Sequence, residues 1–127
     1  DVYRLSPDSK ELVVAAPSED YSKNDLIFTD TQSGEELSRI EIGEQPIGAI
    51  AYYPNGKFLM AADTTSIYRI DLTDKKVTWK EQMVKSEQNV SDPIRIADIS
   101  FSPDGKYLAV LQSDEQLSLV QLEEFLQ

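Results

Sequence analysis

The heptapeptide Ser102–Leu108, which reads SPDGKYL, has two counterparts earlier in the chain, Tyr53–Leu59 (YPNGKFL) and Ser6–Leu12 (SPDSKEL). The prolines of the three copies lie 47 and 49 residues apart. Each copy predicts a tight turn, because proline presets φ, Asp or Asn bonds to the local backbone, and glycine supplies a positive φ. Ser9 replaces the glycine in the first copy. If Ser9 is left-handed it costs about 1 kcal/mol, so we expect that turn to be looser.

Short apolar runs with strand character flank every turn, and a more polar run that alternates apolar and charged residues follows in the first two copies. A repeat of 47 to 49 residues fits a four-stranded β-propeller blade better than a helical repeat. We therefore expect an all-β chain of antiparallel sheets. The expected strands cover residues 2–5, 12–16, 25–30, 37–42, 47–53, 58–62, 66–71, 77–81, 94–101, 107–111 and 116–121.

This pattern predicts about 2.75 blades in a single partial domain. Blade 1 covers about residues 1–45, blade 2 about 46–92, and blade 3 about 93–127, without its outer strand. Closed propellers use four to eight blades, so the expected ring is incomplete and each end blade leaves an apolar face uncovered. Those faces are expected to carry Leu12, Val13, Val14, Leu26 and Ile27 in blade 1, and Tyr107, Leu108, Val110, Leu117 and Leu119 in blade 3. The favoured source of the missing strands is a longer parent chain, and the alternative is a second copy in a self-complementing homodimer.

Composition excludes several kinds of chemistry. The 127 residues contain no histidine and no cysteine, which removes Cys/His metal sites, thiol nucleophiles and Ser-His-Asp triads. A formal net charge of −11 disfavours binding to nucleic acid and to anionic membrane surfaces. No apolar run approaches the length of a membrane span. We expect no cofactor and no tightly bound transition metal.

Three segments, Asn24–Gly34, Ile42–Gly48 and Pro54–Lys57, resemble the YVTN-type β-propeller repeat. That family is similar to the cytochrome cd1-like and quinoprotein amine dehydrogenase-like propellers. The resemblance implies a propeller fold and a periplasmic or secreted location, and it supplies no catalytic residues. A tryptophan–aspartate propeller fits less well, because a Gly-His pair is impossible without histidine and Trp79 precedes Lys80.

Candidate binding residues lie on the loops expected at one end of the blades. The longest of these loops, residues 16–24, contains Glu19, Asp20, Tyr21 and Lys23. A long loop of mixed charge with an aromatic residue is suited to contacting a partner, and the alternative is a solvated insertion without a role. Glu44 and Gln45 lie in the loop at 43–46 and join the same candidate surface.

The strand expected at 94–101 carries two further candidates. Asp98 should lie near the central channel, either as a solvated or hydrogen-bonded acid or as a metal-binding or catalytic one. Arg95 is either its ion-pair partner or a contact for an anion. The aromatic residues Trp79, Tyr52, Tyr53 and Tyr68 belong either to the core or to a stacking platform for sugars or bases.

These observations favour a non-catalytic binding or scaffold module that engages a protein partner or a larger assembly through its loop face. The alternative is a propeller domain or subunit of a redox enzyme whose cofactor is held elsewhere. That alternative rests on fold analogy. We therefore name no catalytic residue and no metal ligand.

Overall fold

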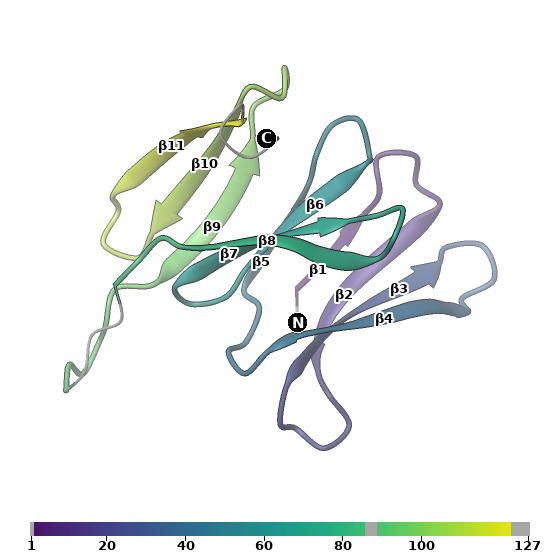
Figure 1. The fold of residues 1–127 in the computed structure, drawn as a ribbon, viewed down its shortest axis with the longest axis horizontal. Coiled ribbons are helices and arrows are strands. Elements are labelled where there is room, and N and C mark those ends of the chain that lie inside the picture. The colour runs from purple at the N-terminus through teal and green to yellow at the C-terminus, as the bar shows by residue number, and fades with distance from the viewer. Residues whose placement is uncertain (1, 86–88, 123–127) are drawn as a thin grey trace.

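The computed structural model describes residues 2–85 and 89–122, in which eleven β-strands form three antiparallel sheets (Figure 1). Two sheets have four strands and the third has three, each in simple up-and-down order. The strands are β1 (Val2–Leu5), β2 (Glu11–Pro17), β3 (Asn24–Asp30) and β4 (Glu36–Gly43) in blade 1; β5 (Ala49–Tyr52), β6 (Phe58–Ala62), β7 (Ser66–Asp71) and β8 (Lys76–Gln82) in blade 2; and β9 (Ile96–Phe101), β10 (Tyr107–Gln112) and β11 (Leu117–Gln121) in blade 3.

All eleven expected strands are present, and the all-β prediction of antiparallel propeller blades is confirmed. The described residues contain no helix that is long and apolar enough to cross a membrane. Residues 86–88, between the strands expected at 77–81 and 94–101, and residues 123–127, at the end of the third expected blade, lie outside the described part of the chain.

The three repeated turns connect the first and second strands of their blades and have the same geometry. Ser9, Gly56 and Gly105 all have positive φ, at 64°, 76° and 74°. Each donates its backbone N–H across the turn at 2.9 Å, to a carbonyl three residues earlier. The expectation of a looser first turn is therefore wrong. Serine tolerates the left-handed conformation here because the same bonds hold the turn closed.

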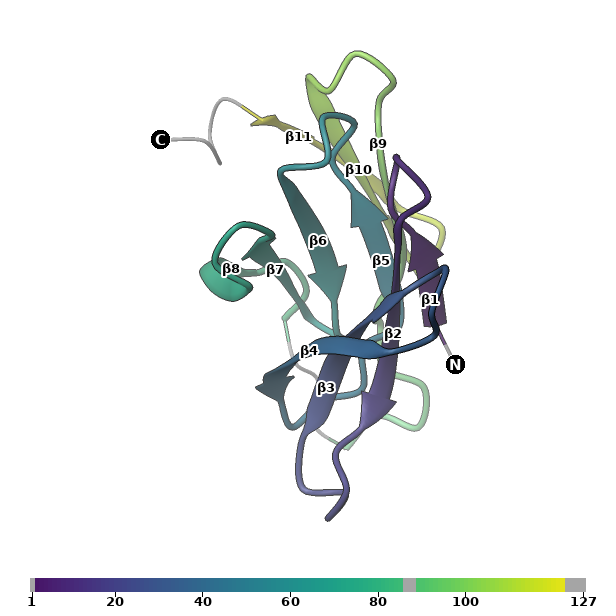
Figure 2. The same cartoon turned by 90° about the vertical axis from the view of Figure 1, so that its right-hand side faces the viewer.

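Blade 2 is packed on both faces, which explains why every residue of β6 is buried. The inner strand β5 lies beside β1 on one side and β9 on the other, and the three sheets fan out from these inner strands (Figures 1 and 2). One core fills the space between blades 1 and 2 and includes Leu26, Phe28 and Leu59. A second core between blades 2 and 3 includes Met60, Ile67 and Leu108.

Blades 1 and 3 each bury one face and leave the other without a packed neighbour among the described residues. Side chains alternate along each strand, so Val13, Leu26, Leu108 and Val110, which we expected on the open faces, are instead fully buried against blade 2. The open face of blade 3 carries side chains that are substantially exposed, Tyr107, Leu111, Leu117 and Leu119. The open face of blade 1 carries Tyr3 and Leu5, also largely exposed, and the half-buried Leu12, Val14 and Ile27.

The repeat relates these open faces to the two faces of blade 2. Leu12 of blade 1 is equivalent to Leu59, which blade 2 packs against blade 1. Tyr107 of blade 3 is equivalent to Phe58, which blade 2 packs against blade 3. The two open faces are therefore the two different halves of one kind of interblade joint.

Candidate functional site

The loops at one end of the blades are linked across blade boundaries into a continuous polar surface, which we call the loop face. Within blade 1, Lys23 Nζ forms an ion pair with Glu44 Oε1 at 3.4 Å. From blade 1 to blade 2, the Oγ1 of Thr64 donates to Gln45 Oε1 at 3.2 Å. From blade 2 to blade 3, the Ile96 N–H donates to the Thr64 carbonyl at 2.8 Å. Six candidates are exposed on this surface: Glu19, Asp20, Tyr21, Glu44, Gln45 and Arg95.

The loop between β2 and β3 is ordered by the same side-chain hydrogen bonds as the first and third repeated turns. Ser18 Oγ donates to Asp20 Oδ1 at 2.9 Å, and the Lys23 N–H donates to Ser18 Oγ at 3.1 Å. In the first turn, Ser6 Oγ donates to Asp8 Oδ1 and the Glu11 N–H donates to Ser6 Oγ. The β2–β3 connection, residues 18–23, is longer than its counterparts at 63–65 and 113–116, and it forms a further copy of the turn at the opposite end of blade 1.

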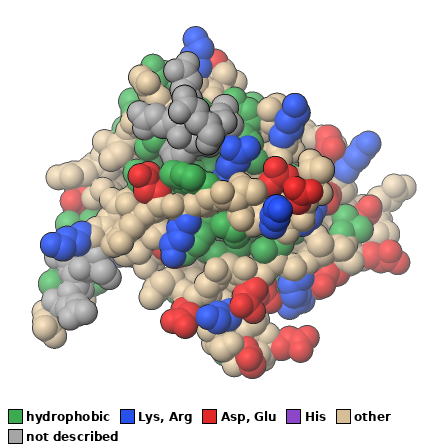
Figure 3. All heavy atoms as spheres, viewed as in Figure 1, with side chains coloured by type: hydrophobic (Ala, Val, Ile, Leu, Met, Phe, Trp, Pro, Cys, Tyr) green, Lys and Arg blue, Asp and Glu red, His purple; other side chains and the backbone are tan. Residues whose placement is uncertain are grey.

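This turn fixes Asp20 and presents Tyr21. Hydrogen bonds from Ser22 and Ser18 lower the pKa of Asp20 to about 2, so its carboxylate is charged at neutral pH. Tyr21 occupies the position that is glycine in two of the repeated turns, with φ at 61°, and its side chain is 82% exposed. Acidic side chains gather at the lower end of Figure 3, where this loop lies. The loop face thus holds an exposed aromatic ring in an acidic setting.

Arg95 and Asp98 lie in different places. Arg95 belongs to the loop face, where its Nη1 forms an ion pair with Asp92 Oδ1 at 3.6 Å and its N–H donates to Ser113 Oγ. Asp98 lines a separate groove beside the inner strands, with Arg4 and Tyr52 among the other lining residues. Its Oδ1 accepts a bond from the Ile99 N–H at 2.9 Å. The suggested Arg95–Asp98 pair is therefore replaced by Arg95–Asp92.

Three of the four aromatic candidates pack in the protein interior. Tyr68 is buried and donates its hydroxyl to Asp63 Oδ2, and burial together with that carboxylate raises its pKa. The Tyr53 ring stacks on Phe58 with centroids 4.5 Å apart. Trp79 is half-buried against the core between blades 2 and 3. These three do not form an exposed stacking platform, whereas Tyr52 lines a pocket.

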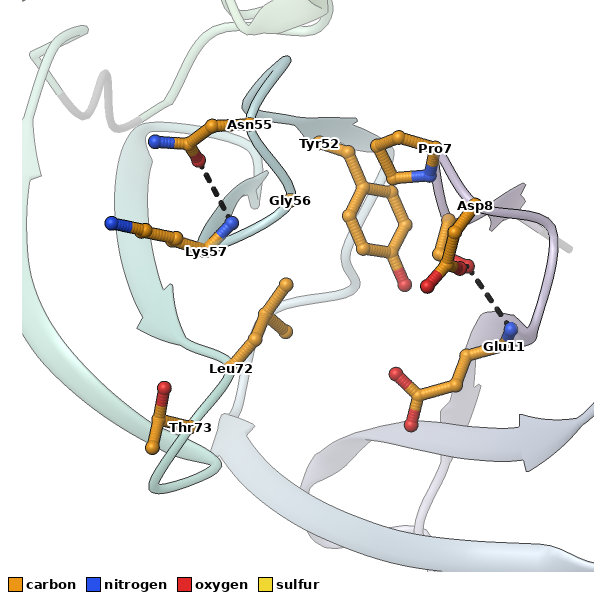
Figure 4. Close-up of a pocket in the computed structure, with 10 residues that line it drawn as sticks. Pro7, Asp8, Glu11, Tyr52, Asn55, Gly56, Lys57, Leu72 and Thr73 are labelled. Carbon is orange, nitrogen blue, oxygen red and sulfur yellow. Dashed lines mark hydrogen bonds between the residues drawn. The ribbon is translucent and has the colours of Figure 1, made fainter.

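That pocket lies between blades 1 and 2 (Figure 4). It is at the end of the blades that carries the repeated turns, which we call the turn end, opposite the loop face. It encloses about 320 Å³. Its walls are the β1–β2 turn of blade 1 and the β5–β6 and β7–β8 turns of blade 2. Sequence inspection missed it because its residues come from segments far apart in the chain: Ser6, Pro7, Asp8, Glu11, Tyr52, Asn55, Gly56, Lys57, Leu72 and Thr73.

Within residues 2–85 and 89–122, no group of three or more Asp and Glu side chains is arranged to hold a metal ion. Asp63 illustrates how the acidic residues are used instead. Its Oδ1 accepts bonds from the N–H groups of Thr65 and Ser66 at 2.9 and 2.7 Å, so this carboxylate organises the β6–β7 turn.

No protein-family model and no curated protein matches the sequence. Many solved structures are similar to it, including the following two. Hydrazine synthase from Kuenenia stuttgartiensis has a TM-score of 0.76 and 19% identity, over 94% of this chain and 32% of that one. The β-propeller domain of Cps50 (Swd1) from Myceliophteria thermophila has a TM-score of 0.71 and 14% identity, over 94% of this chain and 34% of that one. The chain spans about one third of each of these structures. Together with the three stacked antiparallel sheets, these similarities show that the chain has the β-propeller fold.

Proposed function

We propose that the chain is a non-catalytic propeller module, of the YVTN type and extracytoplasmic, that engages a protein partner through its loop face. The observation that carries this proposal is the rigid turn at residues 18–23, which holds the exposed Tyr21 in place. A tyrosine in the left-handed conformation costs about 1–2 kcal/mol that glycine would not. The hydrogen bond from the Tyr21 N–H to the Ser18 carbonyl fixes the backbone that carries this ring, which lowers the entropy lost on binding. Tyrosine is also enriched among residues that dominate binding energy.

The charge of the loop face indicates the kind of partner that fits it. Glu19, Asp20 and Glu44 surround the turn, and the whole chain carries a formal charge of −11. A basic protein segment would be attracted to this surface, and a lysine or arginine from it could also stack on the Tyr21 ring. Opposite charge chiefly speeds association and selects the partner.

Site-specific photocrosslinking tests this proposal. A photocrosslinking amino acid at position 21 should capture a protein partner, whereas the same group at position 106, an exposed lysine at the turn end, should not. Tyr21→Ala should then weaken the affinity for the captured protein by about thirtyfold, as expected for a dominant aromatic contact. Equal capture from positions 21 and 106, or an unchanged affinity of the Tyr21→Ala variant, would contradict the proposal.

We also propose that the two open apolar faces pack against further blades. The support is that two similar solved structures, one of them a β-propeller domain, have chains about three times as long as the segment they share with this one. The rest of a longer parent chain is the favoured source of these blades, and a second copy is the alternative. Sedimentation of the 127-residue chain tests this. A soluble monomer at all concentrations with a cooperative melt would contradict it.

The alternative function, a propeller subunit of a redox enzyme whose cofactor is held elsewhere, has one point of support. One of the structurally similar proteins is hydrazine synthase. At 19% identity this similarity concerns the fold alone. Copurification of the chain with a redox subunit would favour this alternative over the scaffold.

A further inference from the structure

The turn-end pocket between blades 1 and 2 occupies a position that aromatic rings fill between blades 2 and 3. There, Tyr53, Phe58 and Phe101 pack together, with ring centroids 4.5 to 5.9 Å apart. The repeat aligns these three residues with Ser6, Glu11 and Tyr52, in the same order. Two rings are thus replaced by small or charged side chains, and the space that they would fill is the 320 Å³ cavity.

Tyr52 contributes a buried hydroxyl that lacks a hydrogen-bond partner among the described residues. The hydroxyl is directed toward the side of the pocket formed by Asp8 and Glu11 (Figure 4). Burial and the charges of Glu11 and Asp8 raise its pKa, so it remains neutral. Buried polar groups are nearly always hydrogen-bonded, so this unpartnered oxygen is a reason to look for a ligand.

Three charged side chains line the pocket, Asp8, Glu11 and Lys57, and the two carboxylates indicate which ligand fits. Asp8 is held ionised by Ser6 Oγ and the Lys10 N–H, which lower its pKa. Glu11 is paired with Lys75 Nζ at 3.2 Å. The carboxylate of Asp8 and the hydroxyl oxygen of Tyr52 both accept hydrogen bonds, and an ammonium group has three donors and no acceptor.

We propose that this pocket binds a small primary ammonium compound. Its charged head donates to Asp8 and to the Tyr52 hydroxyl oxygen, and its short alkyl chain packs against Leu72 and Pro7. The cavity is at the small end of ligand sites, so a chain of about four carbons is suitable. Because this pocket lies opposite the loop face, the proposal is independent of the partner-binding function.

Titration of the isotope-labelled chain with n-butylammonium, followed by amide chemical shifts, tests the proposal. Saturable shifts should appear at residues 6–11, 52–57 and 72–73. At the same ionic strength, n-butanol and butyrate are the neutral and anionic controls and should give none. Absence of saturation with n-butylammonium, or equal binding of n-butanol, would overturn the proposal.

Matched variants locate the site. Tyr52→Phe removes only the hydroxyl and should weaken binding about three- to tenfold, the loss of one hydrogen bond. Tyr53→Phe removes a hydroxyl at the other junction, where it donates to the Gly105 carbonyl, and should leave binding unchanged. Glu11→Phe should refill the pocket and abolish binding, while the dispersion of the amide chemical shifts shows that the variant is still folded. Wild-type affinity in Tyr52→Phe or in Glu11→Phe would refute the assignment.

Discussion

Gly56 and Gly105 occupy the same position of the repeated turn, yet we predict very different costs for replacing them with alanine. Both have φ near +75°. A Cβ on Gly105 would lie 2.6 Å from Tyr53 Oη and 3.0 Å from its Cζ, whereas one on Gly56 would meet no described atom within 4 Å. The Tyr53 ring is stacked on Phe58 and meets Phe101 edge-on, so it cannot move aside easily.

The magnitudes follow from these contacts. Alanine in the left-handed conformation costs about 1–2 kcal/mol, and the smaller entropy of its unfolded state offsets about 0.5–1 kcal/mol. Gly56→Ala should therefore destabilise by about 1 kcal/mol. At Gly105, overpacking adds about 1–3 kcal/mol, and displacing Tyr53 removes its 3.2 Å bond to the Gly105 carbonyl, worth about 1 kcal/mol. Gly105→Ala should thus cost about 3 kcal/mol or more.

Urea unfolding followed by the fluorescence of Trp79, which packs against the same core, measures both free energies. Variants with the wild-type denaturant slope can be compared directly. Replacing Tyr53 with leucine in the Gly105→Ala background should recover part of the loss, because the two positions are in contact. If the two glycine variants lose equal stability, the close approach of Tyr53 to Gly105 is wrong.

Three further outcomes are expected. Tyr21→Gly removes the left-handed strain and should stabilise by about 0.5–1 kcal/mol, and an unchanged or lower melting temperature would argue against the strain. The pKa of Asp20 is about 2, below its usual 3.8, so its stabilising effect is present above pH 4 and lost as pH falls through 2. Asp20→Asn should therefore weaken the pH dependence of urea unfolding between pH 4 and 2, and an unaltered dependence would contradict this. Leu108→Ala, at a fully buried position, should lower the free energy of unfolding by about 2–5 kcal/mol, whereas Leu119→Ala on the open face should lower it far less. If chemical denaturation gives similar losses for both variants, the open face is covered.

The strands and turns were predictable because their signals are local. Turn residues such as Pro54 and Gly56 have fixed conformational preferences, and apolar runs such as Phe58–Ala62 directly follow them. Which side chains are buried was less predictable. Val13 and Val14 are both apolar and differ only in the face on which the alternation places them, and the sheet that covers Val13 comes from another repeat.

The candidate loop and the pocket are features that short stretches of sequence did not predict. The sequence Ser18-Glu19-Asp20 shares the Ser-x-Asp pattern of the first and third repeated turns, but it has Glu19 and Tyr21 where those turns have proline and, in the third, glycine, so the longer loop was not predicted to form a turn of this kind. The turn-end pocket depends on Glu11 and Tyr52 meeting across a blade boundary. Aligning the repeats already shows Glu11 where the other copies have Phe58 and Tyr107, so this exchange was the available signal.

The difference between the two open faces gives the stack of blades a polarity. A blade joins its neighbours through two unlike surfaces, so two chains placed back to back through the same face cannot reproduce the joint between blades 1 and 2. Blades that join through these two unlike surfaces are therefore all added in the same rotational direction. Each repeat of 47 to 49 residues therefore carries both halves of the joint, one for the blade before it and one for the blade after it.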